Sequence, residues 1–232
     1  FMTGDGTDTL SDYDLTTDNT DVVQLSDVKS TEITALERVG SSLVLRYGTT
    51  DQLTISNYFS GTAYGIEQFQ FSDGVVWDGA VIKATVITNG DSNNNTITGY
   101  SDGTNRIYGL DGNDYLNGGA LDDTIDGGNG RDNLTGNSGN DYLLGGADND
   151  TLNGSDGDDM LVGDVGNDSL NGGTGSDTLI GGKGDDRYYL NPLSTAFFQD
   201  VMGYPGNSGP VFPTRDYDVV VEAADEGTDT VY

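Results

Sequence analysis

One apolar residue recurs at a spacing of nine residues through the middle of the chain, apart from a single ten-residue step between Ile97 and Ile107. Between residues 90 and 190 it is the central residue of a triplet, and stretches rich in Gly, Asn and Asp separate the triplets. One inward side chain per short strand fits the two-residue alternation of β structure. The pattern predicts short strands joined by tight turns, with a core formed by Ile97, Ile107, Leu116, Ile125, Leu134, Leu143, Leu152, Leu161, Leu170, Leu179 and Tyr188.

The predicted turns carry Gly and Asp at fixed places of a nine-residue unit. Residues 109–117, for example, read GLDGNDYLN. Glycines at the first, second and fourth places permit positive φ and let backbone carbonyls turn inward. Two weaker units, with Asn95 and Asn105 at the sixth place, precede the regular ones. Asp occupies the sixth place of nine successive units, namely Asp114, Asp123, Asp132, Asp141, Asp150, Asp159, Asp168, Asp177 and Asp186.

Two units make one coil of 18 residues, so alternate strands fall in two sheets whose Leu and Ile side chains meet. Turns two units apart then stack, which aligns Asp114 with Asp132, Asp150, Asp168 and Asp186 on one edge, and Asp123 with Asp141, Asp159 and Asp177 on the other. Carboxylates and carbonyls between stacked turns form an all-oxygen cage, which suits Ca²⁺ better than Mg²⁺. Nine Asp turns predict seven well-formed cages, with poorer ones at the ends.

The flanking segments follow other patterns. Residues 31–86 alternate β-branched and aromatic residues and predict an antiparallel β module with two hairpins, one turning at 48–51 and one at Asp73-Gly74. A conventional core is the main interpretation of this module, and a binding face around Tyr58, Tyr64 and Trp77 is the alternative. Residues 1–30 are expected to form a degenerate repeat and strand segment.

The C-terminal segment, residues 191–232, is predicted to combine an irregular aromatic loop with capping strands. The loop, residues 191–215, contains all four prolines of the chain. We interpret it as a cap on the last coil, with a binding loop as the alternative.

The net negative charge of the chain restricts which partners it can bind. Acidic residues number 39 against 9 basic ones, the formal net charge is -30, and residues 90–190 contain Asp but no Glu. Such charge opposes compaction unless cations neutralise it, so nucleic acid and anionic membranes are unsuitable partners. Low hydrophobicity with high net charge is typical of disordered chains. We therefore expect a region that is disordered without cation and folded with it.

The chain lacks the residues of several catalytic sites. It contains neither His nor Cys, which excludes thiolate catalysis, Cys-ligated zinc and a Ser nucleophile with its usual base. The serines in Gly206-Asn207-Ser208-Gly209-Pro210 and Gly90-Asp91-Ser92 are therefore interpreted as turn residues. No stretch is long enough to span a bilayer. We predict no enzymatic activity and no membrane insertion in this chain, although a longer parent protein could be an enzyme or a toxin.

Residues 90–190 resemble the RTX (repeats-in-toxin) family of hemolysin-type calcium-binding proteins. Residues 31–86, with LVLRYGTTDQLTISNYF and IEQFQFSDGVVWD, are similar to the β module that often neighbours such arrays. The resemblance implies an all-β fold, a right-handed parallel β-roll with two nonapeptides per coil and a flanking antiparallel β module. It also implies about seven or more Ca²⁺ ions.

In the family, the sixth-place Asp and the carbonyls of the first four places hold the ions. Departures at Leu121 and Asp148, and the Asn residues at 95 and 105, predict weak or empty sites. By resemblance the carbonyl roles fall on Gly109, Gly112, Gly118, Gly119, Gly127, Gly128, Gly130, Gly136, Gly139, Gly145, Gly146, Gly154, Gly157, Gly163, Gly166, Gly172, Gly173 and Gly175.

The resemblance further implies type I secretion from a Gram-negative bacterium, without an N-terminal signal, and folding outside the cell or at its surface. We expect the chain to be an excerpt of a longer protein and to be a monomer. Two functions remain open. The first is a calcium-driven folding and secretion module attached to a toxin, protease or lipase. The second is a region of a surface adhesin that binds a glycan or another surface ligand.

Overall fold

The computed structural model describes residues 1–11, 13, 20–60, 66–190, 197–200, 218–222 and 227–232. These residues form two compact units, unit 1 (Phe1–Asn89) and unit 2 (Gly90–Tyr232). Both consist almost entirely of β structure. None of the described helices is long and apolar enough to cross a membrane.

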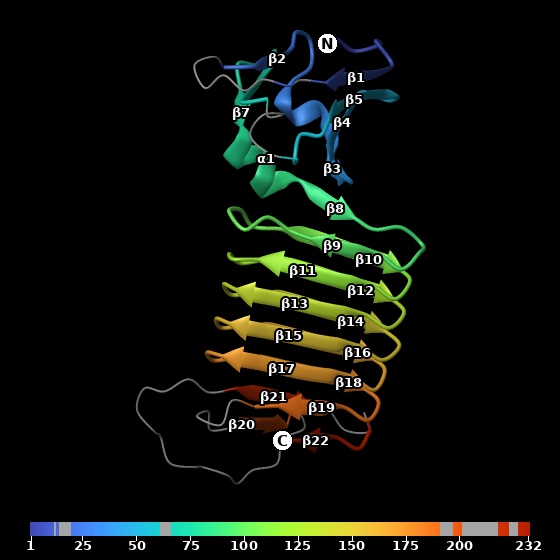
Figure 1. The fold of residues 1–232 in the computed structure, drawn as a ribbon, viewed down its shortest axis with the longest axis vertical. Coiled ribbons are helices and arrows are strands. Elements are labelled where there is room, and N and C mark those ends of the chain that lie inside the picture. The colour runs from blue at the N-terminus through green and yellow to red at the C-terminus, as the bar shows by residue number, and fades with distance from the viewer. Residues whose placement is uncertain (12, 14–19, 61–65, 191–196, 201–217, 223–226) are drawn as a thin grey trace. The chain divides into compact units, whose positions relative to one another are not determined.

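Unit 2 is a parallel β-roll (Figure 1). One sheet runs in the order β10-β12-β14-β16-β18-β21-β20, and the other in the order β22-β19-β17-β15-β13-β11-β9. The strands are β9 (Thr96–Thr98), β10 (Arg106–Asp111), β11 (Tyr115–Gly119), β12 (Thr124–Asn129), β13 (Asn133–Ser138), β14 (Tyr142–Ala147), β15 (Thr151–Asp156), β16 (Met160–Val165), β17 (Ser169–Thr174), β18 (Thr178–Lys183), β19 (Arg187–Tyr189), β20 (Phe197–Asp200), β21 (Val219–Glu222) and β22 (Thr230–Val231).

The register of the roll follows the nine-residue unit. Leu116 pairs with Leu134, and Leu134 pairs with Leu152, so strands two units apart lie side by side. This confirms the predicted coil of two units. Most strands are six residues long rather than three, because pairing continues past the triplet into the first places of the next unit, as between Asp111 and Asn129.

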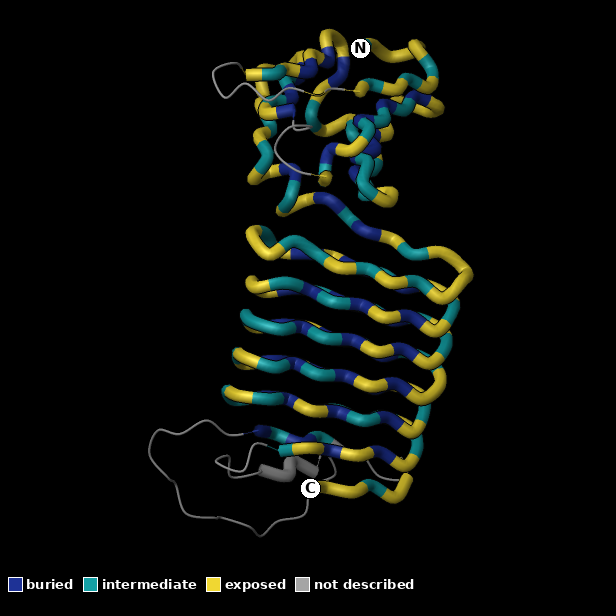
Figure 2. The backbone as a smooth tube through the Cα atoms, viewed as in Figure 1, coloured by how far each residue is buried: buried dark blue, intermediate teal, exposed yellow. Residues whose placement is uncertain are grey.

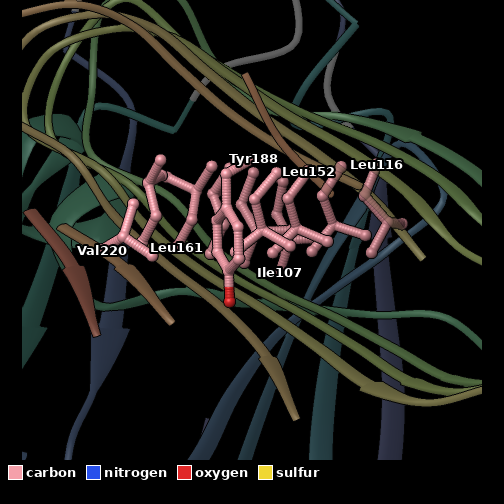
Figure 3. Packing of buried hydrophobic residues seen from close by; sticks show 11 residues of the cluster. Ile107, Leu116, Leu152, Leu161, Tyr188 and Val220 are labelled. Carbon is pink, nitrogen blue, oxygen red and sulfur yellow. The ribbon is translucent and has the colours of Figure 1, made fainter. Parts of the chain in front are cut away.

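A single row of side chains forms the core of the roll (Figure 3). The Leu and Ile residues from Ile107 to Leu179 are completely buried. Tyr188 ends the predicted row and is also completely buried, and its hydroxyl accepts a hydrogen bond from the Gly181 backbone N–H at 2.8 Å. Buried and more exposed residues alternate along each coil, as Figure 2 shows.

The roll continues beyond residue 190. β21 pairs in parallel with β18, and β22 pairs in parallel with β19. Val220 of β21 joins the core. The strands expected to cap the roll therefore add to its two sheets. Apart from β20, which pairs with β21, the aromatic loop predicted at 191–215 lies outside the described residues.

Unit 1 contains two sheets, ordered β1-β5-β4-β3-β8 and β2-β6-β7. Both predicted hairpins are confirmed, since β4 pairs antiparallel with β5 and β6 pairs antiparallel with β7. The elements are β1 (Thr7–Ser11), β2 (Val22–Leu25), the 3-10 helix η1 (Ser30–Glu32), β3 (Ile33–Val39), β4 (Ser42–Tyr47), β5 (Asp51–Ser56), β6 (Gln68–Phe71), β7 (Val76–Asp78), α1 (Gly79–Thr85) and β8 (Ile87–Asn89).

Unit 1 contains the predicted antiparallel pairings, and it has two features that were not predicted. First, β1 and β2 come from the separate segment predicted at residues 1–30, yet they pair in parallel with β5 and β6. The sheets of unit 1 are therefore mixed, and they include residues from both predicted segments. Second, helix α1 follows β7. Asp78 caps it by accepting a hydrogen bond from the Val81 backbone N–H at 2.9 Å, a local signal for a helix start.

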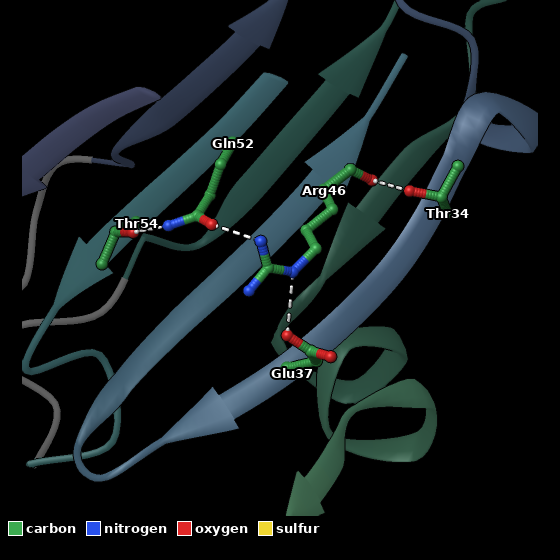
Figure 4. Close-up of polar contacts among 5 residues, drawn as sticks. All are labelled: Thr34, Glu37, Arg46, Gln52 and Thr54. Carbon is green, nitrogen blue, oxygen red and sulfur yellow. Dashed lines mark hydrogen bonds and ion pairs between the residues drawn. The ribbon is translucent and has the colours of Figure 1, made fainter. Parts of the chain in front are cut away.

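The inner and outer faces of the β3–β4–β5 sheet differ in polarity. Leu43, Leu45, Leu53 and Ile55 are completely buried. On the other face, Arg46 Nε lies 3.1 Å from Glu37 Oε2, and Arg46 also donates a hydrogen bond to Gln52 Oε1 (Figure 4).

Two of the three aromatic residues of the alternative binding face pack against unit 1 itself. Tyr58 is only 8% exposed and contacts the rings of Phe59 and Phe69, and Trp77 lies edge-on to Phe71. Tyr64 lies outside the described residues. Tyr58 therefore belongs to the conventional core that was the main interpretation.

Candidate metal centre

The nine sixth-place Asp residues stand where each turn enters a strand, in register between successive coils. The backbone N–H of Asp114 donates a hydrogen bond to Asp132 Oδ1 at 2.7 Å, and the same bond recurs 18 residues on. The remaining bonds of this ladder, at 2.7 to 2.9 Å, join Asp123 to Asp141, Asp141 to Asp159, Asp150 to Asp168, Asp159 to Asp177 and Asp168 to Asp186. The predicted alignment of the Asp residues along two edges is therefore present.

The second carboxylate oxygen, Oδ2, of each of these nine residues has no hydrogen-bond partner. From Asp114 to Asp186 the residues are at most 3% exposed, and Oδ2 of each is buried without a hydrogen bond. Burying a charged oxygen without a partner is costly, and proteins usually compensate by pairing the charge or coordinating a metal. One oxygen of each carboxylate is thus held by the backbone, and the other is free to bind a cation.

Glycines leave the space that these oxygens occupy. A Cβ on Gly127 would collide with Asp132 Oδ2 and with the carbonyl oxygen of Gly145. At the fourth place, Gly130 has a φ of 118°, and a Cβ there would collide with the carbonyl oxygen of Gly112 in the preceding coil. The other predicted first-place glycines also face the Oδ2 of their own unit, namely Gly109, Gly118, Gly136, Gly145, Gly154, Gly163 and Gly172.

The remaining predicted glycines allow close approach of the preceding coil. A Cβ on any of them would meet its backbone, and all but Gly119 have positive φ. These residues are Gly112, Gly119, Gly128, Gly139, Gly146, Gly157, Gly166, Gly173 and Gly175. Carboxylate and carbonyl oxygens therefore gather beside the turns, a donor set that suits a hard cation such as Ca²⁺.

Burial raises the pKa of most of these carboxyl groups. The pKa rises to about 6 for Asp123, Asp132, Asp159 and Asp168, to about 7 for Asp141 and Asp177, and to about 8 for Asp150. Desolvation is the largest cause, the backbone N–H donor opposes it, and neighbouring carboxylates add to it. For Asp150 these neighbours include Asp168 and Asp132. A cation between stacked turns would offset both the desolvation and the repulsion.

The two irregular fourth-place residues behave differently. Asp148 takes a positive φ of 78° and so preserves the turn at some cost in strain, whereas Leu121 does not take a positive φ. Asn95 and Asn105 donate their backbone N–H groups to Asp114 Oδ1 and Asp123 Oδ1, at 2.7 and 2.6 Å. The ladder of hydrogen bonds thus extends to the first two units, in which Asn95 and Asn105 provide neutral side chains in place of carboxylates.

Two carboxylates that extend the ladder at its C-terminal end, Asp218 and Asp229, were not predicted from the sequence. The backbone N–H of Asp177 points to Asp218 Oδ1 at 3.4 Å, and that of Asp186 donates to Asp229 Oδ1 at 2.9 Å. Asp218 is completely buried. These residues lie 41 and 43 positions after their partners, so a search for an 18-residue spacing misses them. The sequence pattern that could have identified them is an Asp directly before a short strand that contains Val.

A second ladder at the fifth place was also missed. Asn113 Oδ1 accepts a hydrogen bond from the Arg131 backbone N–H at 2.9 Å, and Asn149 Oδ1 accepts one from Asn167 at 2.8 Å. Asp122 Oδ1 makes the equivalent bond with the backbone N–H of Asn140. The signal was the frequent Asn or Asp directly before the sixth-place Asp. These side chains therefore also link successive turns.

Comparison with known proteins agrees with this geometry. Residues 43–81 match the haemolysin-type calcium binding protein related domain. The RTX calcium-binding nonapeptide repeat matches residues 89–125, 100–134, 126–161, 135–170 and 162–191. The chain is similar to the iron-regulated protein FrpA of Neisseria meningitidis serogroup C, with 38% identity over 126 residues. This match covers 53% of the chain but 10% of the relative. No solved structure matches the chain. Residues 89–191 thus carry RTX calcium-binding nonapeptide repeats, and residues 43–81 of unit 1 carry a haemolysin-type calcium binding protein related domain.

Proposed function

We propose that Ca²⁺ binds between the stacked turns of unit 2 and drives the folding of the roll. The observation that carries this proposal is the set of nine buried Oδ2 atoms without a partner. Each ion would take carboxylate oxygens from two sixth-place Asp residues two units apart, together with carbonyl oxygens of the turns. The seven cages within the regular array are joined in this proposal by two more, which pair Asp177 with Asp218 and Asp186 with Asp229.

The thin core explains why the metal is needed. Only one row of apolar side chains separates the two sheets of the roll. Burial contributes roughly 25 cal/mol per Å² of apolar surface, whereas ordering the backbone costs about 1–2 kcal/mol per residue. Desolvated carboxylates oppose folding further. Because the cages exist only in the folded chain, the free energy of Ca²⁺ binding becomes folding free energy.

The proposed setting is the exterior of a Gram-negative bacterium, reached by type I secretion. There Ca²⁺ would fold a chain that leaves the cell unfolded. The matched relative, an iron-regulated protein, is about ten times longer than the matched region, so this role concerns a module and leaves the activity of a parent protein to its other parts. The module itself would act through structural calcium sites, without catalysis and as a monomer.

Circular dichroism during a Ca²⁺ titration tests the folding role. After removal of metal with a chelator, unit 2 should lack β structure, and adding Ca²⁺ should restore it in a cooperative transition. Mg²⁺ at the same concentration should restore much less, because it demands octahedral geometry and dehydrates reluctantly. Light scattering of the Ca²⁺ form should give the mass of one chain, 24.4 kDa. A β spectrum that persists unchanged in excess chelator would refute the proposal.

A further inference from the structure

Unit 1 contains a lone turn that repeats the plan of the nonapeptide. In Gly4-Asp5-Gly6-Thr7-Asp8-Thr9-Leu10, the glycines stand at the second and fourth places, Asp8 at the sixth and Leu10 at the eighth. Gly4 and Gly6 have positive φ values of 91° and 87°, as the glycines of the roll do. This segment lies outside the residues that the two family matches cover.

Asp51 accepts hydrogen bonds from this turn with both carboxylate oxygens, whereas an Asp of the ladder uses only one. Its Oδ1 accepts the backbone N–H of Gly6 at 3.0 Å, and its Oδ2 accepts that of Gly4 at 3.0 Å. Asp51 is 4% exposed. Gly48 supplies the space, because a Cβ there would lie 2.7 Å from Asp51 Oδ2. The same combination of a turn amide, a buried carboxylate and a facing glycine builds the edges of the roll.

Asp8 then provides a carboxylate oxygen without a partner. It pairs in register with Leu53, which is completely buried, so its side chain lies on the inner face of the sheet. Asp8 Oδ2 is buried and makes no hydrogen bond, which is the state of the nine Oδ2 atoms in the roll.

Tyr47 gives an independent indication of a missing ligand. It lies opposite Asp51 on β4, is 1% exposed, and its buried hydroxyl also has no hydrogen-bond partner. Burial raises the pKa of this phenol, and the charges of Asp51, Asp8, Asp5 and Asp27 raise it further. Tyr47 and Gly48 also line a cavity of about 370 Å³ together with Asp27 and Thr3.

We propose that unit 1 binds one Ca²⁺ ion of its own at this corner. Asp8 and Asp51 would supply carboxylate oxygens, and the Tyr47 hydroxyl would face the ion as a neutral oxygen. A hard cation with several oxygen ligands would satisfy the two orphaned atoms together and balance the neighbouring negative charges. The site would tie β1 to the β4–β5 hairpin, and it needs no residue of the roll.

Nuclear magnetic resonance of the full chain during a Ca²⁺ titration tests this site. The backbone amides of Gly4, Gly6 and Gly48 should shift with Ca²⁺, and Asp8→Asn should abolish these shifts while the amides of the roll respond as in the unchanged chain. Glu37→Gln is the matched control, because it removes a carboxylate from the outer face of the same sheet. It should leave both responses unchanged.

Tyr47→Phe is a second test of the unit 1 site, for the case in which Asp8→Asn unfolds unit 1. It removes the hydroxyl but keeps the aromatic ring in the core. It should move the midpoint of the unit 1 shifts to higher Ca²⁺ concentration without moving the midpoint of the roll. The proposal is overturned if the three glycine amides ignore Ca²⁺, or if Asp8→Asn or Tyr47→Phe gives the same unit 1 titration as Glu37→Gln. The response of the roll amides to Ca²⁺ tests the proposed folding role of calcium independently of the unit 1 site.

Discussion

At the scale of single residues, the two oxygens of one carboxylate perform different tasks. Oδ1 of a sixth-place Asp accepts a backbone N–H from the coil before it, which fixes the side chain, and Oδ2 is left buried and unpaired. The shorter reach of Asp relative to Glu matters here, because the accepting oxygen must lie directly across from a backbone amide in the adjacent turn. The absence of Glu from residues 90–190 agrees with this demand.

The raised pKa values predict how metal-free unit 2 responds to pH. The pKa values of Asp123, Asp141 and Asp150 in the folded roll are about 6, about 7 and about 8, above the ordinary Asp value of about 3.9 in an unfolded chain. The folded roll therefore binds more protons, so its stability is greatest in acid and is lost as the pH rises through these values.

In chelator, lowering the pH from about 8 to about 5 should thus increase the β signal in circular dichroism. Protons should also compete with Ca²⁺, and the Ca²⁺ midpoint should move to higher concentration over the same range. A metal-free spectrum that does not change across this range would contradict the assigned pKa shifts.

Removing one ladder carboxylate tests the shared cages. Asp150 lies between Asp132 and Asp168, so Asp150→Asn should weaken Ca²⁺ binding in two cages at once. We expect the Ca²⁺-loaded roll to lose roughly 1–3 kcal/mol or more, the cost of disturbing a buried charged group. Calorimetry and thermal unfolding in Ca²⁺ measure this. Asp111→Asn, an equal charge change at an exposed strand residue, should have little effect.

The sequence predicted the ladder residues because the period repeats without interruption from Asp114 to Asp186. It could not predict Asp218 and Asp229, whose places in the ladder depend on strand pairing across 41 and 43 residues. It also could not predict that Asp51 would accept amides from Gly4 and Gly6, a contact that depends on the tertiary pairing of β1 with β5.

At the scale of elements, the turns of the roll accept fewer residue types than its strands do. The strand needs one apolar residue, and Leu, Ile and Tyr all serve. The turn needs a residue without a side chain where carbonyls of successive coils approach, as at Gly130. Asp148 and Asp164 take positive φ although they are not glycines, which shows that this backbone conformation by itself is tolerated in the roll.

A pair of Gly→Ala substitutions separates collision from backbone strain. Gly130→Ala places a Cβ against the Gly112 carbonyl, whereas Gly40→Ala has a positive φ of 59° with open space around it. Positive φ in a residue other than Gly costs about 1–3 kcal/mol. We expect Gly40→Ala to lose no more than this, and Gly130→Ala to lose more and also to weaken Ca²⁺ binding. Denaturant unfolding in Ca²⁺ measures the difference, and equal losses would argue against the collision.

Periodicity predicted the elements of the roll well and those of unit 1 only in part. Local alternation and the Asp73-Gly74 turn sufficed for the two hairpins. Nothing local specifies that β1 and β2 pair in parallel with β5 and β6, since those pairings join distant segments. Helix α1 is only seven residues long, with one buried side chain, Ile82, so it carries almost no helical period.

At the scale of the whole molecule, the negative charge of the chain opposes its folding. The chain carries a formal net charge of -30, and its most regular region places its carboxylates in two columns. Nine bound Ca²⁺ ions, as proposed for unit 2, would neutralise more than half of that charge. Repulsion along the columns would then give way to attraction between each ion and the turns above and below it.

This balance predicts a contraction on adding Ca²⁺. Size-exclusion chromatography or X-ray scattering should find an expanded chain in chelator and a compact one in Ca²⁺, because the radius of gyration of a disordered segment of this length is roughly two to three times that of a folded one. Sodium chloride at equal ionic strength should screen repulsion without producing the compact form. Equal contraction by sodium chloride would point to simple screening rather than bound calcium.

The pairing of β18 with β21 has a consequence for engineering. Leu179 and Val220 are neighbours in space, although dozens of residues separate them in the chain. At that point the roll requires another Asp followed by another apolar strand. The pairing of β18 with β21 does not depend on how many residues connect them. A foreign loop or small domain grafted into the connection between β19 and β21 would be displayed on a scaffold that, under the folding proposal, assembles when Ca²⁺ is added.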